Sequence, residues 1–413
     1  MVRDLRRTPP IPLAALDGRP PSFTRQLHVG APNIGLPAVL FDRLSGALER
    51  RYLSNHGPLV EEFEGRIADR LRVRHCIAVS NATSGLTILA RALGLAGEVV
   101  LPAFTFVGTA HAMRWVGIAP AFCDIRQETH ALDPERVEAT ITSRTSAILG
   151  VHLWGRPCDI TALEAIAARH ELPLLFDAAP AFGSTYRGQP IGGFGTAEVV
   201  SFHPTKVLNT FEGGAVLTND DDLAERVRLM IQFGFEDEDT VVDLGINAKM
   251  SEASAAMGLA SLEVVDEFIA VNRRHHERYR ANLAGLPGLS LVPYPEDDRS
   301  NYQYVVLEID AVRSPISRDA LQQVLRAENI LARRYFYPGC HRMEPYRTEQ
   351  PQAEASLPET NALVERVLQL PTGTALSGED VDGICEILRL AFEHGEEISR
   401  LLPKSAPGER ATF

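Results

Sequence analysis

The stretch His75-Cys-Ile-Ala-Val79-Ser-Asn-Ala-Thr-Ser84 joins a short apolar run to a turn of small polar residues, and a helical period at 84–93 follows. A five-residue apolar run fits a buried strand, and Ser, Asn and Thr commonly begin helices. The stretch therefore predicts one strand–turn–helix unit, the repeating unit of α/β folds.

The same alternation runs from Glu61 to about Thr218, with helical periods such as 134–141 and 160–170 between further apolar runs. The predicted strands are 75–79, 98–102, 120–124, 146–151, 173–177, 197–202 and 213–218. Strands that alternate with helices pair mainly in parallel, with helices on both faces. We therefore expect an α/β fold with a large, mainly parallel seven-stranded sheet.

The texture changes further along the chain. A helical period at 251–283 predicts one long helix. After Pro287-Gly288, a strand-like piece at 302–309 mixes with helical periods near 318–328 and 378–394, which predicts a smaller α+β domain. The expected organisation is an irregular N-terminal arm at 1–30, a large α/β domain at 31–270, a small C-terminal domain at 271–402 and a disordered tail at 403–413.

Composition narrows the function classes. The 413 residues carry a net charge of -13, which argues against binding to nucleic acid or to an anionic membrane. No apolar run reaches the about 18 residues of a membrane span, and the Arg-rich N-terminus lacks the apolar core of a secretion signal. The five cysteines are widely spaced and match no disulfide or zinc pattern. We expect a cytoplasmic protein without a metal site.

Lysine is rare in this chain. Lys206, Lys249 and Lys404 are the lysines among 41 cationic residues, so chemistry that needs an amine has three candidates. Lys206 follows the predicted strand 197–202, and a desolvated lysine at such a place can form a Schiff base with an aldehyde. A plain surface lysine after a strand fits the same position.

Three other features follow predicted strands. Asp177 could hold the ring nitrogen of pyridoxal 5'-phosphate (PLP) protonated, or could cap a helix. The turn 80–84 could cradle a phosphate at a helix N-terminus, or could simply be a cap. Phe106 could stack on a planar cofactor, or could belong to the core. With Lys206 these are the four parts of a PLP site, so the sequence predicts PLP as the cofactor.

Several dispersed motifs occur in one order between about Tyr52 and Leu370. They are Ser54-Asn-His-Gly-Pro-Leu-Val60, Val79-Ser-Asn-Ala-Thr-Ser-Gly-Leu86, Val151-His-Leu-Trp-Gly155, Asp177-Ala-Ala179, Ser201-Phe-His-Pro-Thr-Lys206, Glu212-Gly-Gly214, Gly245-Ile-Asn-Ala-Lys-Met-Ser-Glu252 and Leu370-Pro371. In this order the chain resembles the DegT/StrS-type sugar aminotransferases, which are fold-type I PLP enzymes.

The resemblance implies a role for each site residue. Lys206 would bind PLP as a Schiff base and carry the proton, Asp177 would pair with the ring nitrogen, and Phe106 would stack on the ring. The implied phosphate ligands are Ala82, Thr83 and Ser201. Asn247 would reach the phosphate of the neighbouring subunit's cofactor, which makes a homodimer the functional unit.

The implied sugar-nucleotide residues are Asn55, His56, Gly57 and Pro58. Two positions depart from the family's pattern. Pro180 stands where the family usually has Gln or His near the phenolic oxygen of the cofactor, and Ala82 replaces the usual Gly of the phosphate turn. The lost hydrogen bond at Pro180 would perturb the pKa of the lysine–cofactor linkage.

The reaction implied by the resemblance is transamination with L-glutamate as the donor. Within the family the chain is most like enzymes that convert TDP-4-keto-6-deoxy-D-glucose to TDP-4-amino-4,6-dideoxy-D-glucose, in antibiotic or surface-glycan biosynthesis. A 3-keto sugar is the near alternative. A PLP-dependent sugar 3-dehydratase is a second, although those relatives have His in place of Lys206. A non-catalytic PLP-binding regulator is a third.

Overall fold

The computed structural model describes residues 13–402, and its larger part is built on a seven-stranded sheet. The strands are β2 (His75–Val79), β3 (Glu98–Pro102), β4 (Ala119–Cys123), β5 (Thr145–Val151), β6 (Leu174–Asp177), β9 (Ala197–Ser201) and β10 (Gly214–Thr218). Their order is β2-β10-β9-β6-β5-β3-β4, and β10 alone runs antiparallel to its neighbours. The predicted α/β class is confirmed, and for these seven strands each predicted end lies within one residue of the observed end.

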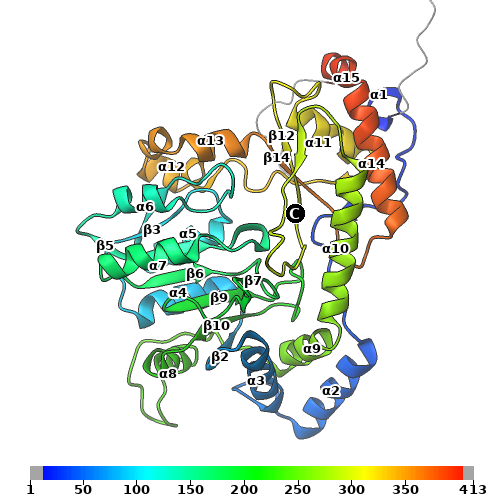
Figure 1. Cartoon of the computed structure of the whole chain (residues 1–413). Coiled ribbons are helices and arrows are strands. Elements are labelled where there is room, and N and C mark those ends of the chain that lie inside the picture. Colours follow the sequence, from blue (N-terminus) through cyan, green and yellow to red (C-terminus); the bar gives the residue numbers. More distant parts are fainter. Residues whose placement is uncertain (1–12, 403–413) are drawn as a thin grey trace, which may run out of the picture.

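Helices cover both faces of this sheet, as Figure 1 shows. On one face lie α4 (Ala82–Ala92), α5 (Val107–Trp115) and α8 (Asp221–Met230); on the other lie α3 (Pro58–Leu71), α6 (Pro134–Thr140), α7 (Ile160–Arg169) and α9 (Glu252–Leu262). Successive strand residues point to opposite faces. In β2, Ile77 and Val79 therefore pack under the first set of helices, while Cys76 and Ala78 pack under the second. Helix α2 (Pro37–Arg50) packs against α9.

A smaller antiparallel sheet forms the centre of the C-terminal part. It contains β11 (Leu289–Leu291), β12 (Val305–Ile309) and β14 (Val367–Leu370) in that order. The helices of this part are α10 (Val265–Asn282), α11 (Arg318–Ala327), α12 (Tyr346–Glu349), α13 (Pro358–Val364), α14 (Gly378–Glu393) and α15 (Gly395–Leu401). Short elements complete the chain: α1 (Ala14–Asp17), β1 (Leu27–His28), β7 (Thr185–Tyr186), β8 (Gln189–Pro190), β13 (Ile330–Leu331), and 3-10 turns at Leu153–Gly155, Cys340–Arg342 and Ala353–Ser356.

The expected single helix at 251–283 is wrong. Helix α9 ends at Leu262 and α10 begins at Val265, because Val264 adopts a non-helical backbone (φ -127°, ψ 11°). Almost every residue of α9 is buried, whereas α10 has a polar face toward solvent. The chain turns between them to pass from the large sheet to the small one (Figure 1), and helix-forming residues on both sides of the turn conceal it in the sequence.

The N-terminal arm expected at 1–30 contains two short elements in the part that the structure describes. From residue 13 the chain forms α1 and β1, and β1 pairs in parallel with β13 of the C-terminal part. Leu13 and Leu27 are buried there, and the Glu328 carboxylate accepts the backbone N–H groups of Ala14 (2.6 Å) and Ser22 (2.7 Å). Residues 1–12 and the predicted tail at 403–413 lie outside the described residues. Among helices in residues 13–402, none is long and apolar enough to span a bilayer.

Candidate active site

The candidate residues follow parallel strands that end at one edge of the large sheet. Strands β2, β3, β6 and β9 run in the same direction, so the turn after Val79, the loop to Phe106, Asp177 and the loop to Lys206 all leave from that edge. Ligands of α/β proteins bind at this edge. The sheet topology thus brings together residues that the sequence separates by more than a hundred positions.

Asp177 is a buried carboxylate that is fixed in orientation. It is 6% exposed; the Thr109 hydroxyl donates to Oδ2 at 2.7 Å, and the Ala179 N–H donates to Oδ1 at 3.1 Å. Thr109 itself pairs with Thr105 at 3.0 Å, and both threonines are buried. The carboxylate is therefore held before a ligand arrives.

Lys206 lies half-buried on the loop after β9, and its Nζ donates to the Tyr304 hydroxyl at 2.9 Å. Burial lowers the pKa of this amine, but the opposing influences of Tyr304, Asp177 and Tyr335 leave the pKa above its usual value. Because Asp177 acts electrostatically on Lys206, the amine and the carboxylate share one site.

The turn after β2 has the form of an anion cradle. The Asn81 side chain accepts the Ser84 N–H at 2.8 Å, and the Asn81 carbonyl accepts the Gly85 N–H at 3.1 Å. The N–H groups of Ala82 and Thr83, at the start of α4, have no acceptor within the helix. Gly214 of β10 closes the turn from behind, since a Cβ there would lie 2.7 Å from the Ala82 nitrogen.

Ser201 and Phe106 lie beside this turn. Ser201 is buried at the end of β9 and pairs across the ladder with Gly214, which touches Ala82. Phe106 is 54% exposed, so its ring lies at the surface and not in the core. A Cβ on Gly108 would meet both the Phe106 ring (3.0 Å) and the Thr83 hydroxyl (3.3 Å), which shows that ring and hydroxyl are neighbours.

The structure does not bring the remaining predicted residues to Lys206 within one chain. His56 instead contacts Glu64 (3.0 Å) and Arg228 (3.2 Å), beside a cavity of ≈ 150 Å³ that Lys249 also lines. The hydrogen bond to Glu64 raises the pKa of His56 above its usual value. Asn55 and Gly57 are in the same loop as His56, and Pro58 begins α3. A Cβ on Gly57 would collide with Tyr52 and Glu252. Asn247 is exposed on the loop after α8.

Sequence reasoning missed Thr109, Tyr304 and Tyr335, which act on Asp177 or Lys206. Thr109 carries a recognisable signal, because it lies three residues after Phe106 and follows the same strand end. Tyr304 carries no local signal, because it enters from the small sheet 98 residues after Lys206. Pro180 contributes its carbonyl to the Asn301 side-chain N–H at 2.7 Å.

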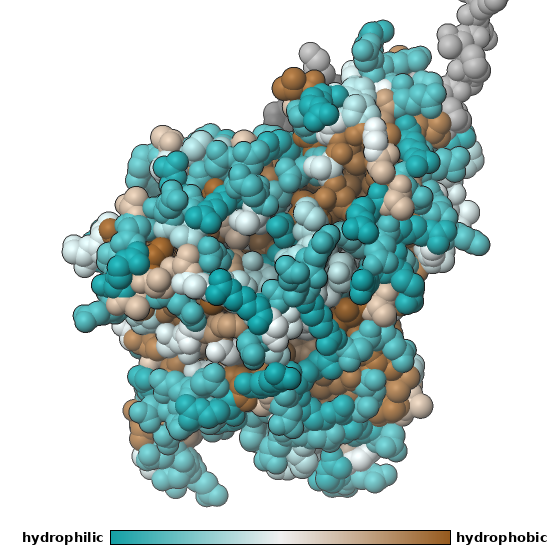
Figure 2. All heavy atoms as spheres, viewed as in Figure 1, coloured by the Kyte–Doolittle hydropathy of each residue, from teal (hydrophilic) through white to brown (hydrophobic). Residues whose placement is uncertain are grey.

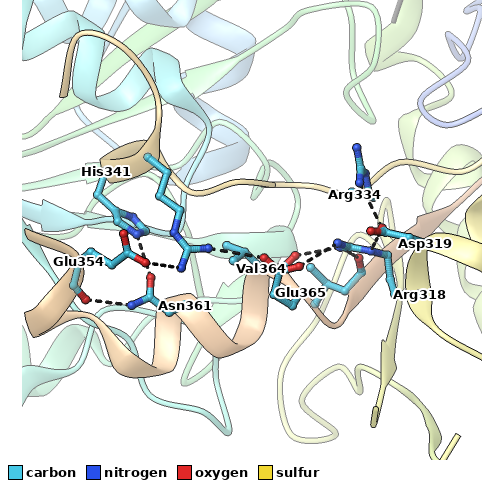
Figure 3. A network of polar contacts seen from close by, with 10 residues as sticks. Arg318, Asp319, Arg334, His341, Glu354, Asn361, Val364 and Glu365 are labelled. Carbon is cyan, nitrogen blue, oxygen red and sulfur yellow. Dashed lines mark hydrogen bonds and ion pairs between the residues drawn. The ribbon is translucent and has the colours of Figure 1, made fainter. Parts of the chain in front are cut away.

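A polar network holds the segment that brings Tyr335 to the site. Figure 3 shows Arg318 and Arg334 meeting at Asp319, with Nε–Oδ1 and Nη1–Oδ1 distances of 2.6 and 3.1 Å. Arg318 is 4% exposed and also donates to the Val364 carbonyl at 2.8 Å. The network ties the chain after β13, which includes Tyr335, to α11 and α13.

These residues fit PLP. The buried Asp177 carboxylate suits a protonated ring nitrogen, the Lys206 amine suits the aldehyde, and the first turn of α4 suits the phosphate. Gly214 leaves the cradle free of a side chain that would push the turn away.

Comparisons with known proteins agree with this geometry. The model of the DegT/DnrJ/EryC1/StrS aminotransferase family matches residues 39–389. A crystal structure of DesI with its TDP-sugar product superposes with a TM-score of 0.90 and 50% identity, covering 94% of this chain and 98% of that one. The dTDP-4-amino-4,6-dideoxy-D-glucose transaminase of Escherichia coli is 34% identical over 88% of this chain and 98% of its own length. The UDP-2-acetamido-2-deoxy-3-oxo-D-glucuronate aminotransferase of Pseudomonas aeruginosa is 32% identical over 80% of this chain and 90% of its own length.

Proposed function

The chain belongs to the DegT/DnrJ/EryC1/StrS aminotransferase family, and we propose that it transfers the amino group of L-glutamate to C4 of TDP-4-keto-6-deoxy-D-glucose, giving TDP-4-amino-4,6-dideoxy-D-glucose. It is a PLP-dependent aminotransferase that acts on a nucleotide-linked sugar. The observation that carries the finer assignment is the likeness to the E. coli transaminase named for this product, over nearly its whole length. The TDP-sugar in the DesI structure supports the choice of nucleotide.

We propose that Lys206 and Asp177 perform the chemistry. Bound PLP supplies an electron sink that loosens the C–H bond beside the amino group. Lys206 Nζ tethers the cofactor and, as the free amine, removes the proton from that carbon and returns it at the other end of the transfer. Asp177 keeps a proton on the ring nitrogen, and the two hydrogen bonds to its oxygens hold it in place for that task.

The other sequence-predicted residues bind and orient. We propose that the first-turn N–H groups of Ala82 and Thr83 would hold the phosphate with Ser201, and that Phe106 would stack on the cofactor ring. Because Asn55–Pro58 and Asn247 lie away from Lys206 in one chain, they would serve the site of a second chain.

We propose that the functional form is a homodimer. Two exposed apolar surfaces flank the large sheet: Ile34, Leu36, Phe41, Leu48, Tyr52 and Leu53 around α2, and Phe233, Phe235, Val241, Val242, Leu244 and Ile246 on the loop after α8. Figure 2 shows apolar surface at the end of the molecule where α2 and α9 lie. Apolar patches of this kind mark interfaces. The second surface includes the neighbour of Asn247, which supports a site shared between subunits.

A 3-keto sugar is the second candidate substrate, because the P. aeruginosa relative is named for a 3-oxo sugar. Assays of the purified enzyme with glutamate and either TDP-4-keto-6-deoxy-D-glucose or its 3-keto isomer separate the two. We expect amine formation at C4, detected by mass spectrometry of the nucleotide sugar, and none with the Lys206→Ala variant. Turnover of the 3-keto sugar alone would replace the first assignment with the second.

A further inference from the structure

We propose that Tyr304 is a positioning residue for the Lys206 amine, so that a residue of the small domain sets the protonation and direction of the reacting nitrogen. The inference rests on the role proposed above for Lys206. Its starting point is the hydrogen bond of 2.9 Å from Lys206 Nζ to the Tyr304 hydroxyl. In the described part of the chain, no other hydrogen-bond partner of that nitrogen is found.

The contact is made at the hydroxyl end of Tyr304. Lys206 Nζ lies 5.6 Å from the ring centroid but 2.9 Å from the oxygen, so the nitrogen is beyond the edge of the ring and not over its face. The interaction is therefore a hydrogen bond, which has direction. It aims the lysine side chain in a way that a face-on cation–π contact would not.

Tyr304 is itself anchored through its backbone. The Tyr294 hydroxyl accepts a hydrogen bond from the Tyr304 backbone N–H at 3.1 Å. The same hydroxyl can donate to either of two carbonyl oxygens, that of Tyr304 at 2.9 Å or that of Trp154 at 3.1 Å. Burial raises the pKa of Tyr294 far above its usual value, so this hydroxyl keeps its proton. One buried phenol thus fixes the residue before β12 to the loop after β5.

The residues before Tyr304 fasten the same segment to the active-site loops. The Gln303 amide donates to the Thr205 carbonyl at 3.0 Å, directly before Lys206, and Asn272 donates to the Gln303 side-chain oxygen at 2.8 Å. The Asn301 amide donates to the carbonyls of Pro180 (2.7 Å) and Phe182 (3.0 Å), beyond Asp177. Asn301 and Gln303 are buried. Residues 301–304 therefore fix the loop that carries Lys206 and the loop after Asp177 in position relative to each other.

The Tyr304 hydroxyl, which is hydrogen-bonded to Lys206, has a property that the Asp177 carboxylate lacks. The groups that raise the pKa of this amine are Tyr304, Asp177 and Tyr335. The charge of Lys206 in turn lowers the pKa of His203, which lies on the same loop. Asp177 as a carboxylate favours only the ammonium form. A hydroxyl accepts a hydrogen bond from the ammonium and donates one to the neutral amine. Tyr304 can therefore hold Lys206 in both of the protonation states that the reaction needs.

The test uses the scarcity of lysine. With [6-¹³C]lysine, the full-length protein freed of cofactor has three labelled side chains, and loss of one signal in Lys206→Arg assigns Lys206. Titration by NMR then follows its protonation directly. In Tyr304→Phe, the hydroxyl that raises the pKa of Lys206 is removed, while burial still lowers that pKa. We therefore expect Lys206 to titrate at lower pH in this variant. The phenyl ring keeps its packing against Trp154, 5.8 Å between centroids.

Two matched variants control the experiment. Tyr186→Phe removes a hydroxyl that contacts Thr161 at 2.9 Å, far along the chain from this segment, and should leave the Lys206 titration where it is. Tyr335→Phe removes the other tyrosine hydroxyl near Lys206, and its shift should be smaller than that of Tyr304→Phe. A Lys206 titration that does not move in Tyr304→Phe, or that moves more in Tyr335→Phe, would overturn the assignment.

Kinetics of the reconstituted enzyme supply an independent readout. Loss of a hydrogen bond to a charged group should lower the rate of the glutamate half-reaction roughly 10- to 100-fold, with a smaller effect on the KM for the sugar nucleotide. An unchanged rate contradicts the inference. Retained turnover in Lys206→Ala would instead contradict the proposed function, so the two failures are distinguishable.

Discussion

Two hydrogen bonds fix the Asp177 carboxylate, and one comes from a side chain that can be replaced without a change in shape. Thr109→Val removes the donor to Oδ2 and leaves that oxygen buried without its partner. We expect PLP to bind about 10-fold more weakly, which corresponds to about 1.5 kcal/mol for a hydrogen bond to a charged group. Thr109→Ser keeps the donor and should bind PLP close to normally. Equal affinities of the two variants, measured by fluorescence titration, would show that this bond does not hold the carboxylate.

At the scale of elements, Gly214 shapes the turn after β2 from the neighbouring strand, β10. A methyl group there would lie 2.7 Å from the Ala82 nitrogen and 2.9 Å from the Asn81 carbonyl carbon, both backbone atoms that cannot move without shifting the turn. Gly214→Ala should therefore lose PLP affinity. Gly65→Ala is the matched control, because the added methyl on α3 meets no atom within 4 Å and alanine favours a helix by about 1 kcal/mol over glycine. PLP binding of Gly214→Ala equal to that of Gly65→Ala would refute this role of the glycine.

The loop before α3 is linked to Glu64 of α3 by the His56–Glu64 pair, which depends on pH. Because the hydrogen bond to Glu64 raises the pKa of His56 above 6.5, His56 stabilises the fold fully below pH 6.5, and this contribution is lost as the pH rises through the raised pKa. His56→Gln should thus lower Tm more at pH 6 than at pH 8.5. The effect stays below about 1 kcal/mol, since His56 is 39% exposed. Exposed His28→Gln serves as the control, and a pH-independent difference for His56→Gln would contradict the pairing.

The seven strands of the large sheet were readable from the sequence to within one residue, because short apolar runs bounded by turn residues have few other interpretations. The strand-like piece expected at 302–309 begins only at Val305. The break between α9 and α10 was not readable, because helix-forming residues continue through Val264. The lysine, the carboxylate, the turn and the ring each follow a strand, so the parallel sheet fixes their common edge. Tyr304 could not be found in this way, since its place depends on how the small sheet packs against the large one.

At the scale of the whole molecule, the placement of Asn247 predicts that each site uses two chains. Lys206→Ala and Asn247→Asp should each be inactive or nearly so as homodimers, the second because a carboxylate would repel the phosphate. Co-expression of the two variants yields mixed dimers that contain one chain of each. Because each site would take Lys206 from one chain and Asn247 from the other, one site of a mixed dimer contains both changes and the other contains neither. We expect about a quarter of wild-type activity for random pairing in a two-fold dimer. Activity no higher than that of Asn247→Asp alone would show that each site is built from one chain.

The central claim is that Lys206 holds PLP in a site that accepts amino groups from glutamate. An absorbance spectrum of the purified protein, taken before and after addition of glutamate, tests it most directly. We expect a near-visible band from the lysine-bound cofactor, absent in Lys206→Ala, that gives way to a band at shorter wavelength when glutamate is added. A protein that stays colourless after addition of PLP, or whose band persists in Lys206→Ala, would contradict it.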